Sequence, residues 1–174
     1  MAEETTSTVP ELEARVQQME FKLAAIAKSV HLNGLGILNN TARQFNSQAR
    51  DPQDQLQPLH IVESDEPQSL RYRRPNGFPH TLIEAISLRW DAKRLAELLD
   101  FYGVRVLRPG NHISTVSETT GETEDDSAKY IDTNDEIQVG NHSKECFTYF
   151  ISYIGLKRKV VENYLPSTER RQTE

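Results

Sequence analysis

Residues 12–30 read LEARVQQMEFKLAAIAKSV, and this stretch decides the fold. Its apolar residues recur alternately four and three positions apart, which places them on one side of a helix with the spacing of a coiled coil. We call the residues that share this spacing the heptad seam: Leu12, Val16, Met19, Leu23, Ile26 and Val30. The stretch therefore predicts a helix that pairs with a second helix through its apolar side.

The limits of this helix follow from its flanking residues. Thr8 and Glu11 have the spacing of a capping box, which satisfies the free N–H groups of a first helical turn. Glycine lowers helix stability, and the residues that weaken the far end are Asn33, Gly34 and Gly36. We expect a coiled-coil helix over residues 10–33 after a disordered segment at 1–9.

The charges beside the seam indicate an orientation. If Leu12, Met19 and Ile26 are d positions, the e positions include Glu13 and Glu20, and the g positions include Arg15 and Lys22. In a parallel pair, g of one helix faces e of the other, so opposite charges meet; an antiparallel pair brings like charges together. The sequence predicts a parallel homodimer, with packing of the seam onto the chain's own domain as the alternative.

Residues 34–77 predict an extended connector, because Asn, Gln, Pro and Asp are frequent and the prolines break helices. Tyr72 lies among three arginines, an arrangement that suits a phosphate backbone and a stacked base. A second basic run follows near the C-terminus. The candidate nucleic-acid contacts are Arg71, Arg73, Arg74, Lys157, Arg158 and Lys159.

Residues 78–165 predict a small helical domain with two helices of similar design. Thr81 with Glu84 and then Asp91 are capping residues, and Ser143 has the same role later in the chain. Each main helix has apolar residues at helical spacing followed by a glycine that can adopt a left-handed conformation. The apolar sets with their glycines are Leu95, Leu98, Leu99, Tyr102 and Gly103, then Phe147, Phe150, Ile151, Ile154 and Gly155. Two packed helices explain the likeness; a degenerate repeat is the alternative.

Strands and loops are expected around these helices. Residues 104–106 and 112–116 have the pattern of a small hairpin. Residues 117–140 predict a flexible acidic insertion, because residues 118–136 hold eight acids and one lysine. Residues 156–165 predict a short helix whose core-facing side chains are Val160, Val161 and Tyr164. Residues 166–174 are expected to form a disordered tail.

Composition narrows the functional classes. The net charge of −6 opposes a surface that binds nucleic acid all over, and the single cysteine, Cys146, permits no disulfide within the chain. The sequence contains no P-loop and no nucleophile elbow, and its histidines lack metal-site spacing, so we expect no enzyme activity, cofactor or metal. The acidic N-terminus and the lack of a long apolar run predict an intracellular protein, cytoplasmic or nuclear, with no membrane span.

Two resemblances follow from longer motifs. The segments FPHTLIEAISLRWDAKRLAELLDFYGV (residues 78–104) and CFTYFISYIGL (residues 146–156) resemble a helix-extended-helix module of the SAP and LEM kind. SAP members bind DNA, so this resemblance implies DNA as a possible ligand. With NNTARQFNS at 39–47 and QLQPL at 55–59, the chain also resembles a fungal family of uncharacterised proteins named after a meiotically up-regulated gene. That resemblance implies the same order of parts and no particular biochemistry.

The sequence as a whole predicts a mainly α protein: an N-terminal coiled-coil helix, an extended connector and a small helical domain with an acidic insertion. The function that it favours is self-association as a homodimer together with binding of a protein partner. Nucleic-acid binding through the basic clusters is the alternative.

Overall fold

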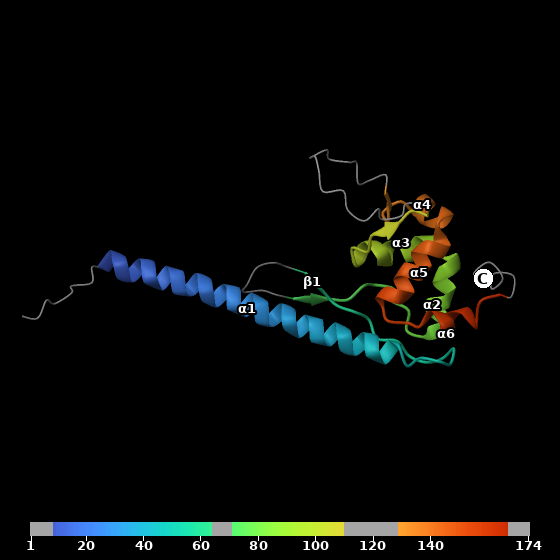
Figure 1. The fold of residues 1–174 in the computed structure, drawn as a ribbon, viewed down its shortest axis with the longest axis horizontal. Coiled ribbons are helices and arrows are strands. Elements are labelled where there is room, and N and C mark those ends of the chain that lie inside the picture. Colours follow the sequence, from blue (N-terminus) through green and yellow to red (C-terminus); the bar gives the residue numbers. More distant parts are fainter. Residues whose placement is uncertain (1–8, 64–70, 110–128, 167–174) are drawn as a thin grey trace, which may run out of the picture. The chain divides into compact units, whose positions relative to one another are not determined.

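The computed structural model describes residues 9–63, 71–109 and 129–166, and it is mainly helical, as predicted (Figure 1). Of the segments expected to be disordered or flexible, residues 1–8, 117–128 and 167–174 lie outside the described residues, whereas Val9 is the first residue of a helix and corrects the expectation for 1–9. The helices are α1 (Val9–Asn46), α2 (Leu82–Ser87), the short 3-10 helix η1 (Leu88–Trp90), α3 (Ala92–Phe101), α4 (Glu136–Asn141), α5 (Ser143–Tyr153) and α6 (Arg158–Glu162). The strands are β1 (Ile61–Val62), β2 (Tyr72–Arg73), β3 (Val106–Leu107) and β4 (Tyr130–Ile131). The chain divides into two units, residues 1–38 with 60–73, and residues 39–59 with 74–174.

The first unit combines most of α1 with a small antiparallel sheet. Strand β1 pairs with β2, with Ile61 opposite Arg73 and Val62 opposite Tyr72. The Tyr72 hydroxyl donates a hydrogen bond of 3.1 Å to the carbonyl oxygen of His31, and the two rings lie 5.2 Å apart between centroids. The sheet is therefore attached to α1 at His31.

Helix α1 is longer than the sequence predicts, and the expected end near Asn33 is wrong. The helix continues through Gly34 and Gly36 to Asn46, so residues 34–46 are not part of an extended connector. Glycine costs a helix only about 1 kcal/mol relative to alanine, which tertiary contacts can offset. In the last turns Ala42 and Asn46 are buried, and their packing supplies such contacts.

The second unit has one core, around which α2 to α6 are gathered (Figure 1). Its capping residues behave as predicted in two cases: the Thr81 hydroxyl accepts from the Glu84 N–H, and the Asp91 carboxylate accepts from the Arg94 N–H. The completely buried apolar side chains are Leu59, Leu82, Ala85, Leu88, Leu95, Leu99, Val106, Val139, Cys146, Phe150 and Ile154. The apolar spacing therefore correctly predicted which residues of α3 and α5 are buried in the core.

Ser143 does not cap α5, which corrects the prediction. It is the first residue of that helix, and its hydroxyl donates a 3.1 Å hydrogen bond to the carbonyl oxygen of Arg89. The hydroxyl thus joins α5 to η1 instead of capping its own helix. A distant carbonyl can compete for a serine hydroxyl in this way, and sequence spacing does not reveal it.

The C-terminal end of α1 is held in the second unit by a buried amide. Asn46 Nδ2 donates to the carbonyl oxygens of Gln57 and Ile154 at 2.9 and 2.8 Å, and its Oδ1 accepts from the Gln57 N–H at 2.7 Å. Arg43 Nε donates to the carbonyl oxygen of Tyr153 at 2.8 Å. Because a buried polar group is costly unless it is paired, these bonds specify how the end of α1 meets the end of α5.

Residues 129–140, the described part of the acidic segment, form a strand and a helix. Strand β3 pairs with Tyr130–Ile131 of β4, whereas the expected partner at 112–116 lies outside the described residues. Helix α4 then begins after Asp135, whose carboxylate accepts from the N–H groups of Ile137 and Gln138. The prediction of a flexible insertion at 117–140 is therefore wrong for residues 129–140, because Ile131 and Val139 are buried in the core.

Candidate self-association surface

The heptad seam lies along α1 and is open to solvent. Each of its six residues exposes between 48% and 65% of its surface. Val16 has the lowest value, and Leu23 and Val30 share the highest. Apolar side chains of this size gain about 1.5–3 kcal/mol each when fully buried, so their exposure favours a partner. The prediction that the seam lies on one helix is confirmed, and its six members share one side of that helix.

The charged residues beside the seam are also exposed. Glu13 and Glu20 follow d positions, and Arg15 and Lys22 precede a positions, as the heptad assignment requires. Arg15 at g and Glu20 at e are five residues apart, the separation at which g and e of two parallel helices face each other. The surface therefore carries opposite charges on its two flanks.

Two apolar residues of this surface are absent from the predicted seam, Val9 at the start of α1 and Ile37 beyond Val30. Ile37 lies seven residues after Val30 and exposes 70% of its surface, so it continues the series of a positions. The seven-residue spacing from Val30 to Ile37 is present in the sequence, but the predicted helix ends at residue 33, before Ile37. The misread signal was the pair Gly34 and Gly36, which α1 includes.

The candidate nucleic-acid contacts form two clusters in the sequence, and the first of them, Arg71 with Arg73 and Arg74, is divided between the two units. Arg71 and Arg73 lie in the first unit, both exposed, and the Arg71 carbonyl accepts from the Glu63 N–H at 2.9 Å. Arg74 belongs to the second unit and is exposed too. Because the Arg71 contact is a backbone hydrogen bond within the small sheet, it gives that guanidinium no fixed direction.

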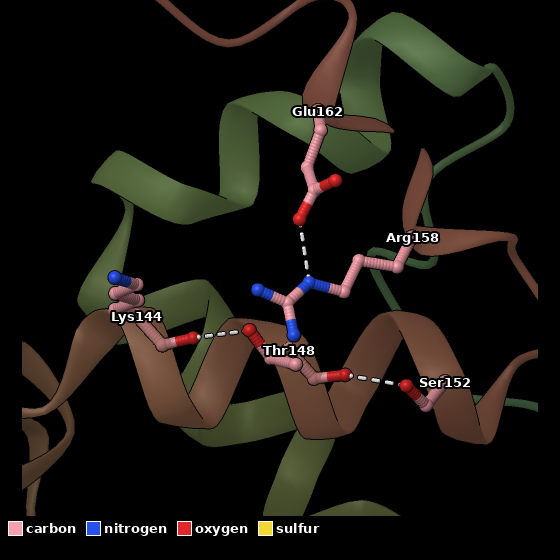
Figure 2. Close-up of polar contacts among 5 residues, drawn as sticks. All are labelled: Lys144, Thr148, Ser152, Arg158 and Glu162. Carbon is pink, nitrogen blue, oxygen red and sulfur yellow. Dashed lines mark hydrogen bonds and ion pairs between the residues drawn. The ribbon is translucent and has the colours of Figure 1, made fainter. Parts of the chain in front are cut away.

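The C-terminal basic cluster is partly neutralised. Lys157, Arg158 and Lys159 are all exposed, and Arg158 Nε binds the Glu162 carboxylate one turn later on α6, as Figure 2 shows. The same view shows the neighbouring face of α5, where the Thr148 and Ser152 hydroxyls donate to carbonyl oxygens four residues earlier, on Lys144 and Thr148. These hydroxyls are therefore engaged in their own helix, and the arrangement is that of an ordinary helical surface.

Chemically reactive groups are few in the described part of the chain. Cys146 is buried, and burial with the nearby Glu145 carboxylate raises its pKa to about 11, so its thiol stays protonated near neutral pH. No group of three or more His, Cys, Asp or Glu residues that could hold a metal ion occurs in residues 9–63, 71–109 and 129–166. Within those same ranges, no helix combines the length and apolar character needed to cross a membrane.

Comparison with known proteins found no match to a family model, to a curated protein or to a solved structure. The resemblances to the SAP and LEM modules and to the fungal family therefore stay predictions. The exposed surface of α1 is therefore the feature from which a function can be inferred.

Proposed function

We propose that this chain is a non-enzymatic interaction protein that forms a homodimer through the heptad seam and uses its helical unit to bind a protein partner. The observation that carries the proposal is the exposure of all six seam side chains on one side of α1. The opposite charges of Arg15 and Glu20 support pairing with an identical helix.

The energetics require that the whole seam participates. A seam side chain that is already half-buried gains about 1 kcal/mol on complete burial. Twelve such side chains in a dimer give a gain of the same order as the roughly 4–15 kcal/mol that association costs. A single charged substitution in the seam should therefore dissociate the dimer, because a charge buried among apolar side chains adds a further penalty.

The test compares two aspartate variants of the full chain by sedimentation at several concentrations. Leu23→Asp places a charge in the seam, whereas Phe21→Asp changes a side chain that is 78% exposed and lies off the seam. We expect wild type and Phe21→Asp to sediment as dimers and Leu23→Asp as a monomer. A monomeric wild type at every concentration, or equal loss of dimer in both variants, would reject the proposal.

Salt separates this proposal from the alternative of nucleic-acid binding. An apolar seam keeps its dimer in 1 M salt, because exposed ion pairs contribute little to it. Phosphate contacts release counterions, so binding through the basic clusters weakens steeply as salt rises. Salt-sensitive nucleic-acid binding that Arg73→Glu weakens would support the alternative function.

A further inference from the structure

The apolar series on α1 extends beyond the six residues of the heptad seam. At intervals of seven, the a positions are Val9, Val16, Leu23, Val30 and Ile37, and every one of them is exposed. The next a position is Gln44, which is polar. The surface available to a partner helix therefore ends at Ile37 and not at Val30.

The d positions contain one polar residue inside this longer surface. Leu12, Met19 and Ile26 are followed at the same interval by Asn33, which is exposed and lies between the a positions Val30 and Ile37. An asparagine at an a position of a coiled coil selects one alignment and one oligomeric state at a cost in stability, and a buried asparagine at d carries the same cost when its amide is unpaired. Its amide can both donate to and accept from an identical amide across the seam.

From these positions we infer that a second copy of this chain pairs with α1 in parallel and in register, with the Asn33 amides of the two copies facing each other. The inference rests on the proposed function and adds the register, with Asn33 as the residue that selects it, to the parallel orientation that the e and g charges predict. Any other alignment would bury the Asn33 amide against apolar side chains, which is unfavourable without a hydrogen bond. The parallel register also sets Arg15 opposite the partner's Glu20.

Two sets of contacts that α1 makes within its own chain, at His31 and at its C-terminal turns, lie away from these positions. Tyr72 binds the carbonyl oxygen of His31, a backbone group at a b position. The buried residues Ala42 and Asn46 follow Asn33 by 9 and 13 positions, which at about 100° per residue places them on the opposite side of the helix from the seam. Neither contact therefore occupies an a or d position between residues 9 and 37.

A parallel register has a consequence for the rest of the molecule. Because both helices run in the same direction, residue 38 of each copy lies at the same end of the pair. Two copies of the second unit would then begin next to each other, which raises their effective concentration toward a partner with two binding sites. An antiparallel pair would separate them by the length of the seam, about 42 Å at 1.5 Å per residue.

Disulfide trapping in the full chain tests the orientation. Cα atoms lie about 2.3 Å from a helix axis, so helices packed about 8–10 Å apart bring facing core Cα atoms to within about 3.5–5.5 Å, which is within the limit of about 7 Å for a disulfide. We expect Ile37→Cys to form a covalent dimer in oxidised glutathione, because identical a positions meet only in a parallel, in-register pair. The matched control is Gln18→Cys at an exposed c position, which should remain uncrosslinked. The native Cys146 is buried and adds little background.

The outcomes are distinguishable from those that test the proposed function. A wild type that dimerises while Ile37→Cys crosslinks no faster than Gln18→Cys would overturn the inference and leave self-association intact. A wild type that is monomeric at every concentration would reject both the proposed self-association and the parallel register. Crosslinking of Ile37→Cys at least about tenfold faster than the control supports the parallel register, since paired thiols reach millimolar effective concentrations.

Asn33→Leu tests the role of the amide. We expect tighter association, by about tenfold or more in dissociation constant, together with assemblies larger than a dimer or a lower crosslinking yield in the Ile37→Cys background. Gln18→Leu, off the seam, should change neither mass nor yield. An Asn33→Leu protein with wild-type affinity, mass and yield would show that Asn33 does not select the register.

Discussion

Two glycines that look equivalent in the sequence differ sharply in their surroundings. Gly103 and Gly155 both follow an apolar helix, and both adopt a left-handed conformation, with φ of 60° and 90°. A Cβ added to Gly103 would meet nothing within 4 Å, whereas one added to Gly155 would lie 2.7 Å from the Arg43 carbonyl oxygen. Gly103 is thus required for its φ alone, and Gly155 also for the close approach of α1.

Alanine at these two positions should separate the two effects. Gly103→Ala should lower the free energy of unfolding by about 1–2 kcal/mol, the cost of a left-handed alanine. Gly155→Ala should cost about 3 kcal/mol or more, because the backbone at Arg43 must also move. Urea unfolding of the second unit measures both. Equal losses for the two variants would contradict the close packing of Arg43 on Gly155.

The amide of Asn46 shows what a single residue contributes to specificity. Its three hydrogen bonds link residues 11 and 108 positions away, and its neighbour Arg43 reaches Tyr153. In the sequence, Asn46 lies in a polar stretch and carries no sign of burial. Its burial is stabilised by the backbone groups of Gln57 and Ile154, which only the tertiary structure brings next to it.

At the scale of the element, α1 depends on more than intrinsic helix propensity. Gly34 and Gly36 predict an end, and yet both lie within the helix with room for a side chain: the atom nearest to a Cβ on Gly34 is the Tyr72 hydroxyl at 3.9 Å, and Gly36 has none within 4 Å. Neither glycine is therefore needed for packing within the described part of the chain. Both glycines lower the stability of the helix locally, and the helix continues because tertiary contacts near its C-terminus, at Ala42 and Asn46, offset that cost.

Alanine at Gly36 should strengthen the helix at this point. Gly36→Ala removes backbone entropy from the unfolded state, so it should stabilise the local helix by about 1 kcal/mol, seen as slower amide hydrogen exchange at residues 34–40. Ala25→Gly, at an exposed position of the same helix, should have the opposite effect of similar size. If exchange at 34–40 is as fast in Gly36→Ala as in wild type, α1 does not continue through this region.

At the scale of the whole molecule, self-association and the helical core belong to different units. The seam lies in residues 1–38, whereas the core described for the second unit is built from residues 39–59 and 74–174. The polar contacts of Asn46 and Arg43 lie entirely within the second unit. We therefore expect the two properties to respond to different changes.

Deletion of residues 1–30 tests this separation. The shortened chain should be monomeric at concentrations where the full chain dimerises, because the six residues of the heptad seam are removed. The amide resonances of core residues such as Leu95 and Phe150 should keep their dispersion, because no residue of the second unit is lost. A shortened chain that still dimerises would place the interface elsewhere, and collapsed dispersion would show that the two units fold together.

By itself, the sequence determined the mainly α class, the apolar seam of α1, the caps at Thr81 and Asp91, and the apolar core of α3 and α5. These features depend on residues within one or two helical turns of each other, so spacing reveals them. Tertiary structure alone decided the length of α1, the pairing of β3 with β4, the order around Ile131 and Val139, and the role of Ser143. Each of these depends on contacts between residues far apart in the chain, whose free energy outweighs local propensity.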